Sequence, residues 1–137
     1  MLTKEQQQEL FSTAIGRLID QGKGAISEGS GTCTYYDVET NTSCAIGILM
    51  PLEIRKSLVN NPINTLLSYG YVTELNGIPV DIYDTDFLTG LQSVHDSSAI
   101  THTGRPTDNF VTLLKGHARR FAVQHQLSPV IRKGEML

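Results

Sequence analysis

The chain contains two cysteines, Cys33 and Cys44, and a thiol can serve as nucleophile, metal ligand, disulfide partner or small core residue. A cysteine at a helix N-terminus meets the positive end of the helix dipole, which favours the reactive thiolate. The segment S-C-A-I-G around Cys44 fits such a position. His95 could then act as the base, with Asp96 to orient its ring. One hypothesis is therefore a cysteine hydrolase or transferase with Cys44 as nucleophile.

The same residues also have a plainer interpretation. Free cysteine is among the most buried residue types, and Cys44 continues into an apolar run. His95 follows Leu91 by four residues and shares its apolar helix face, where a histidine usually packs its ring and hydrogen-bonds a neighbour. Gln92 and Asp96 are also four residues apart and can form a local polar pair. We favour this interpretation, with no catalytic residue, and keep the enzyme as the alternative.

A metal site is a further alternative. Structural zinc sites usually draw on ligands in short-spaced pairs, whereas ten residues separate Cys33 from Cys44 and no second pair exists. A zinc-binding structural protein using Cys33, Cys44 and His95 remains open, but we expect no metal or other cofactor. A hairpin turning near Glu39 would bring the two cysteines within disulfide distance. Reducing conditions in the cytoplasm oppose that bond, so we expect both cysteines to be structural.

Five residues are candidates for contact with a partner protein. Lys115, Arg119 and Arg120 form the only dense basic cluster, on the expected last helix, and arginine is enriched in interface anchors. A solvated helix face is the alternative interpretation of this cluster. Tyr69 and Tyr71 flank a glycine in a predicted loop and are candidate aromatic anchors, although we expect at least one of them to pack in the core.

The expected elements follow from periodicity and turn signals. Apolar residues recur at helical spacing in three segments, residues 4–21, 86–97 and 108–126. Thr3 and Gln6 form a capping box at the first of them. The three helices should pack around a core that includes Cys44, Leu91 and Phe121.

Two hairpins are also expected. One joins residues 32–36 to 42–44, and the other turns at Asn76-Gly77, the strongest short-range hairpin signal in the chain. The predicted fold is mostly α (α+β), a compact helical domain with one or two small β-hairpins. Residues 1–137 should form a single globular domain, with a flexible tail from about residue 128 to 137.

The composition of the chain argues against some classes of binding partner. The chain has 137 residues and a net charge of -3, which argues against nucleic-acid binding, because phosphate recognition uses clustered Lys and Arg. No apolar run approaches the roughly 20 residues that span a bilayer, so we expect no membrane partner. The polar N-terminal stretch lacks a secretory leader, which favours the cytoplasm. A homodimer and a monomer are equally compatible with these properties.

Four short motifs occur in one order along the chain: Gln21-Gly22, Cys33-x-Tyr35, Cys44-Ala45-x-Gly47-x-Leu49 and Leu91-Gln92-x-x-His95-Asp96. Together they resemble the pattern of a family of small bacteriophage and prophage proteins. The resemblance covers about residues 10 to 125, and the chain departs from the pattern at Tyr36 and around the Asn76-Gly77 turn. The resemblance implies an accessory protein in the host-cell cytoplasm that binds a host protein or protein complex, as inhibitors of bacterial defence such as anti-CRISPR proteins do. It brings no catalytic residue.

Overall fold

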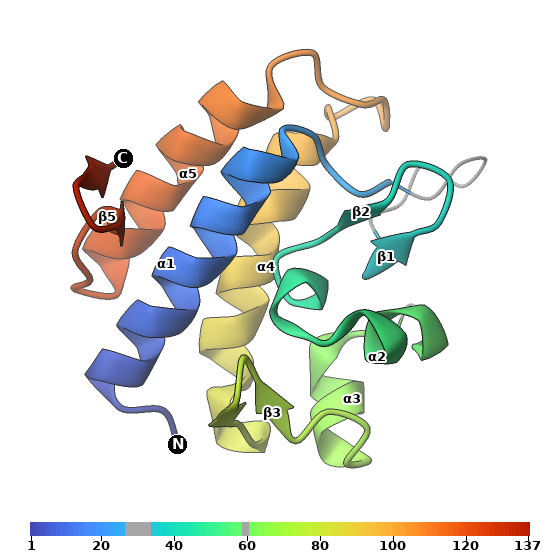
Figure 1. Cartoon of the computed structure of the whole chain (residues 1–137), viewed down its shortest axis with the longest axis vertical. Coiled ribbons are helices and arrows are strands. Elements are labelled where there is room, and N and C mark those ends of the chain that lie inside the picture. Colours follow the sequence, from blue (N-terminus) through green and yellow to red (C-terminus); the bar gives the residue numbers. More distant parts are fainter. Residues whose placement is uncertain (27–33, 59–60) are drawn as a thin grey trace.

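The computed structural model describes residues 1–26, 34–58 and 61–137. Its three longest helices are α1 (Lys4–Gln21), α4 (Thr85–Ala99) and α5 (Phe110–Gln124). They lie side by side, α1 and α4 running in one direction and α5 in the other (Figure 1). The three helices predicted from periodicity are confirmed, with ends that differ from the predicted ones by two residues at most.

The start of α1 shows why the sequence predicted it well. Thr3 accepts a hydrogen bond from the Gln6 N–H at 3.1 Å, and the Gln6 side chain accepts one from the Thr3 N–H at 3.0 Å. This reciprocal capping box satisfies backbone donors that the first helical turn leaves free. Gly22 ends the helix in a left-handed conformation, which glycine adopts without steric cost.

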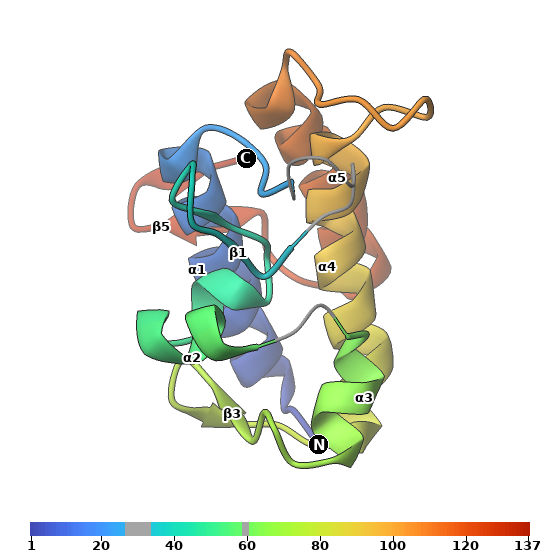
Figure 2. The same ribbon diagram turned by 90° about the vertical axis from the view of Figure 1, so that its right-hand side faces the viewer.

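The middle of the chain supplies short elements that pack on α1 and α4. These are the 3-10 helices η1 (Gly47–Leu49) and η2 (Ile82–Asp84) and the short helices α2 (Leu52–Ser57) and α3 (Ile63–Ser68). η1 packs on α1, and Figure 2 shows α3 beside α4. Pro51 and Pro62 each stand immediately before a short helix, where their fixed backbone angles suit the first turn.

The described residues form three small antiparallel hairpins. The first pairs β1 (Tyr36–Asp37) with β2 (Thr42–Ser43), and the second pairs β3 (Glu74–Leu75) with β4 (Ile78–Pro79). Both hairpins were predicted, but the first strand of the first one was expected over residues 32–36, whereas β1 is Tyr36–Asp37. The turn of the second hairpin places Asn76 and Gly77 at φ of 50° and 77°, the conformation that favours Asn-Gly in two-residue loops.

The third hairpin pairs β5 (Val130–Arg132) with β6 (Glu135–Met136), where the sequence predicted a flexible tail. Ile131 is buried against the core, and the strand packs along α1. Arg132 makes two hydrogen bonds to Asp20 of α1, at 2.8 and 2.9 Å, and a third to Glu135. The contacts with Asp20 join residues 112 positions apart, so no local pattern predicts them.

The core lies where the three long helices meet the middle segment. Phe121 of α5 stacks on Phe11 of α1, with ring centroids 5.6 Å apart, and lies 5.4 Å from the ring of Phe87 of α4. Leu91 and Cys44 are buried in the same cluster. The predicted core membership of Cys44, Leu91 and Phe121 is therefore confirmed.

Candidate functional site

Cys44 lies just before η1 and is fully buried. Its Sγ accepts a hydrogen bond from the Gly47 N–H at 3.4 Å. Burial raises the pKa of the Cys44 thiol to about 12, and the hydrogen bonds that favour the thiolate do not offset this effect. The thiol is thus protonated at neutral pH and shielded from solvent, the opposite of what a nucleophile requires.

His95 is also fully buried, and both of its ring nitrogens have protein partners. The backbone N–H of Ala25 donates to Nε2 at 3.0 Å, so the proton of the neutral ring lies on Nδ1. That Nδ1–H donates to Asp96 Oδ1 at 2.9 Å. Because the lone pair of Nε2 is occupied by a backbone amide, His95 is not positioned to accept a proton from a nucleophile.

Gln92 connects this histidine to the cysteine segment. Its side-chain amide donates to Asp96 Oδ1 at 2.8 Å, while its carbonyl accepts from the Ile46 N–H at 3.2 Å. The polar pair expected between Gln92 and Asp96 is therefore present. The motif Leu91-Gln92-x-x-His95-Asp96 joins α4 to both the C-A-x-G segment and the chain after α1.

Tyr35 of the C-x-Y motif packs against Gly47 of the C-A-x-G motif. A Cβ added at Gly47 would lie 2.1 Å from the backbone oxygen of Tyr35, so only glycine fits. The hydroxyl of the buried Tyr35 donates to the carbonyl of Asn61. Tyr35, Cys44, Gln92 and Asp96 line one cavity of about 520 Å³, and His95 is not among its lining residues.

The burial of Cys44 leads to a prediction that separates a structural thiol from a nucleophile. In a Cys33→Ser variant, where Cys44 is the sole cysteine, we expect iodoacetamide to modify native protein at least about a hundredfold more slowly than urea-unfolded protein. Labelling is followed by mass spectrometry. Because burial raises the pKa of the Cys44 thiol from 9.0 in the unfolded chain to about 12, the protonated thiol stabilises the folded protein below pH 9.0. This stabilisation is lost as the pH rises towards about 12. Fast alkylation of the native protein near neutral pH would contradict the structural role.

The five predicted partner-binding residues do not form one surface. Arg119 and Arg120 are exposed on α5 and Lys115 is half-buried there, with an Arg120 Nη2 2.8 Å from His117 Nδ1. Tyr69 and Tyr71 follow α3, on the other side of α4 from α5 in the view of Figure 1. The predicted basic and aromatic contacts are therefore separate sites.

Tyr69 and Tyr71 are 74% and 65% exposed, with ring centroids 6.2 Å apart. The expectation that at least one of them packs in the core is wrong. Gly70 between them has a φ of 73°, and this left-handed turn brings both rings outward while Val72 enters the core. An exposed pair of tyrosines suits recognition, because each ring offers apolar area and a polar tip with few rotatable bonds.

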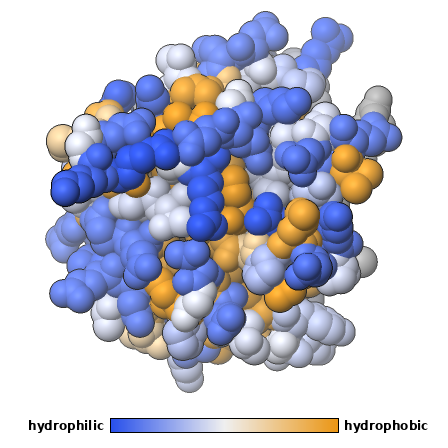
Figure 3. Space-filling model, in the orientation of Figure 1, coloured by the Kyte–Doolittle hydropathy of each residue, from blue (hydrophilic) through white to orange (hydrophobic). Residues whose placement is uncertain are grey.

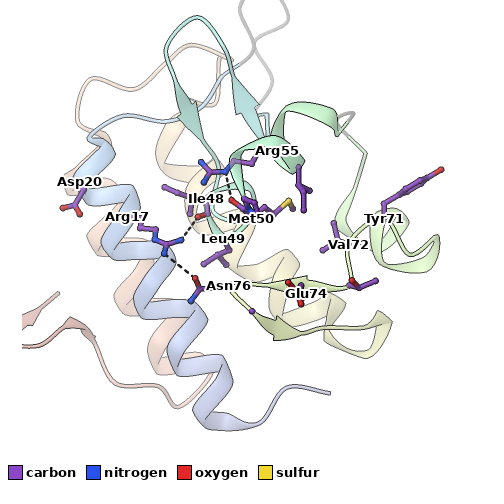
Figure 4. Close-up of a pocket in the computed structure, with 14 residues that line it drawn as sticks. Arg17, Asp20, Ile48, Leu49, Met50, Arg55, Tyr71, Val72, Glu74 and Asn76 are labelled. Atoms are coloured by element: carbon purple, nitrogen blue, oxygen red, sulfur yellow. Dashed lines mark hydrogen bonds between the residues drawn. The ribbon is translucent and has the colours of Figure 1, made fainter.

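Tyr71 also borders a pocket of about 670 Å³ that the sequence did not predict. α1, the η1–α2 segment and residues 71–77 enclose it, and Figure 4 shows Arg17 and Arg55 on one side and Tyr71 on the other. In the orientation of Figure 1, apolar side chains reach the surface near the centre of this face, among hydrophilic ones (Figure 3). No spacing pattern connects Arg17, Arg55 and Tyr71, since they come from three separate segments.

Arg17 and Arg55 are held in this pocket by neutral acceptors. Arg17 donates to the carbonyl of Ile48 at 2.9 Å and to Asn76 Oδ1 at 3.4 Å. Arg55 donates to the carbonyl of Met50 at 2.8 Å and to Ser43 Oγ at 3.0 Å. Burial and the neighbouring charge of Arg17 lower the pKa of Arg55.

Comparison of the chain with protein-family models, curated proteins and solved structures found no match. Within residues 1–26, 34–58 and 61–137, no helix has the length and hydrophobicity needed to cross a bilayer. Across the same ranges, no three His, Cys, Asp or Glu side chains gather as ligands for a metal ion. Cys33, the first residue of the zinc and disulfide hypotheses, lies outside the described residues.

Proposed function

We propose that this protein is an accessory protein of a bacteriophage or prophage that acts by binding a host protein in the host-cell cytoplasm. A component of a bacterial defence complex, the kind of target that anti-CRISPR proteins bind, is the partner class we favour. The exposed Tyr69–Tyr71 pair, which borders a pocket of about 670 Å³, is the observation that carries the binding function. Tyrosine is enriched among the residues that dominate protein–protein binding energies. The phage context rests on the motif resemblance described above.

The cysteine-enzyme alternative is disfavoured by the contacts of its own residues. It needs a thiolate at Cys44 and a free lone pair on His95, but the thiol is buried with a raised pKa and the histidine Nε2 accepts from Ala25. The zinc alternative shares His95, whose two ring nitrogens already have protein partners. Both alternatives would require these buried contacts to be rearranged.

The proposal predicts that tyrosine substitution abolishes capture of a host protein. Tagged wild type is incubated with bacterial host lysate, and retained proteins are identified by mass spectrometry. Because a central aromatic anchor typically contributes about 2 kcal/mol or more, we expect Tyr69→Ala/Tyr71→Ala to retain less than about a tenth of the partner. Both rings are exposed, so thermal unfolding of this variant should match wild type.

An Arg119→Glu/Arg120→Glu variant is the control, since its substitutions lie on α5 away from the tyrosines. We expect it to retain the partner. Loss of the partner in this variant alone would move the binding surface to the basic cluster. Absence of any specific partner, together with turnover of a small molecule by the purified protein, would contradict the binding function and favour the enzyme.

A further inference from the structure

The pocket beside Tyr71 contains two guanidinium groups with unused hydrogen-bond donors. A guanidinium carries five N–H donors in a fixed planar fork. The hydrogen bonds of Arg17 engage one N–H on each of two nitrogens, and those of Arg55 do the same. The remaining donors of each guanidinium have no partner among residues 1–26, 34–58 and 61–137 and can bind a ligand. The acceptors that hold the two groups also fix their positions, which lowers the entropy lost when a ligand binds.

Neither guanidinium has an anionic partner in the part of the chain that the structure describes. The ion pairs there leave out both Arg17 and Arg55. Asp20 lines the same pocket, but its carboxylate pairs with Arg132. Glu74, the other acidic lining residue, is exposed and pairs with neither arginine. Two neighbouring positive charges therefore face the pocket without an ion-pair partner among the described residues, although the whole chain carries a net charge of -3.

The rest of the lining is largely apolar. Met50 and Val72 are buried beneath the pocket, and Ile54 at its rim is 42% exposed. Tyr71 lies across from the two arginines in Figure 4. Its ring lies next to that of Tyr69, and both rings are exposed. The pocket thus has a cationic end and an apolar end. Such a surface suits a peptide segment that carries a carboxylate next to an apolar or aromatic side chain.

We propose that this pocket binds an acidic segment of the partner protein, whose Asp or Glu carboxylate enters between Arg17 and Arg55. An adjoining apolar side chain of that segment packs on Ile54 and Tyr71. This inference rests on the proposed protein-binding function and specifies the chemistry of the partner. Carboxylates match the arginine fork through paired charge-assisted hydrogen bonds, which are stronger than neutral ones.

The test uses short fluorescein-labelled peptides and fluorescence anisotropy. One peptide has glutamates on both sides of a Phe-Leu pair, a second replaces each glutamate by glutamine, and a third replaces each by phosphoserine. We expect the glutamate peptide to bind at least about tenfold more tightly than the glutamine peptide, and to weaken as salt is raised. Equal binding of the glutamate and glutamine peptides would overturn the proposal. Tighter binding of the phosphoserine peptide with none of the glutamate peptide would overturn it as well.

Matched variants locate the binding. Arg17→Gln/Arg55→Gln and Arg119→Gln/Arg120→Gln remove the same charge, but only the first alters the pocket. We expect a loss of about tenfold or more in glutamate-peptide affinity for the first variant and none for the second. Arg17→Gln alone, at an exposed residue, repeats the measurement if the double variant has a lowered melting temperature. Equal affinities for the two double variants would overturn the proposal.

The lysate experiment separates this inference from the proposed function. A partner that is lost with Tyr69→Ala/Tyr71→Ala and also with Arg17→Gln/Arg55→Gln supports both. A partner that is lost only with the tyrosine variant leaves the binding function in place and overturns the acidic-segment proposal. Competition by free citrate that equals competition by unlabelled glutamate peptide would overturn the peptide as occupant and assign the pocket to a small carboxylate.

Discussion

Gly47→Ala is expected to lower the free energy of unfolding by about 3 kcal/mol or more. The new Cβ would lie 2.1 Å from the Tyr35 backbone oxygen and 3.0 Å from its carbonyl carbon, closer than nonbonded atoms approach. The obstacle is backbone, so no side-chain rotation can relieve it. Gly47 does not have a positive φ, which makes space rather than backbone conformation the reason for glycine. The measurement is urea unfolding followed by circular dichroism.

Gly116→Ala is the matched control for this prediction. Gly116 lies within α5, has no positive φ, and a Cβ there meets nothing within 4 Å. Alanine favours helix over glycine by about 1 kcal/mol, so we expect this variant to be as stable as wild type or slightly more stable. If Gly47→Ala unfolds with the same midpoint as Gly116→Ala, the close packing of Gly47 against the Tyr35 backbone is wrong.

His95→Ala is expected to cost about 3 kcal/mol or more of unfolding free energy. The substitution leaves a cavity beside Phe110, whose ring centroid lies 5.7 Å from that of His95. It also leaves the buried Ala25 N–H without its acceptor, and an unpaired buried donor loses its full solvation. Thermal and urea unfolding both report this loss.

Two further variants help to interpret the loss of unfolding free energy in His95→Ala. His95→Phe retains an aromatic ring without the acceptor, so we expect it to lose about 1 to 3 kcal/mol, the part due to the unpaired amide. His102→Ala, at an exposed loop histidine, should change stability by less than about 0.5 kcal/mol. A His95→Ala variant as stable as His102→Ala would mean that the Ala25–His95–Asp96 network does not support the fold.

These predictions assign a structural role to residues of the C-x-Y, C-A-x-G and L-Q-x-x-H-D motifs. Gly47 allows the close approach of the Tyr35 backbone. Gln92 hydrogen-bonds both Ile46 and Asp96, and His95 accepts a hydrogen bond from Ala25 after α1. Motif residues of this kind preserve a fold without acting on a ligand. Under the proposed function, binding uses other surfaces, which can change from one protein to another while the fold is kept.

Local patterns were sufficient for the elements whose contacts are local. The capping box joins Thr3 to Gln6, three positions apart, and the Asn76-Gly77 turn consists of two adjacent residues. Helical periodicity reports which face of a helix is buried. The interpretation of Cys44 as a core residue followed from the apolar run beside it. In each case, the atoms that stabilise the feature belong to neighbours in the sequence, so the residue types there carry the information.

The sequence by itself thus determined a mostly helical α+β fold, its three long helices, two of its hairpins and part of its core. Only the tertiary structure decided that Ala25 is the partner of His95, that both Tyr69 and Tyr71 face solvent, and that Arg17 and Arg55 share a pocket. It also placed Arg132 on Asp20, which turned an expected tail into a hairpin. Each of these features joins segments distant in the chain or depends on the direction of a single turn. Their free energies arise from contacts that exist only once the helices have packed, and no local spacing encodes them.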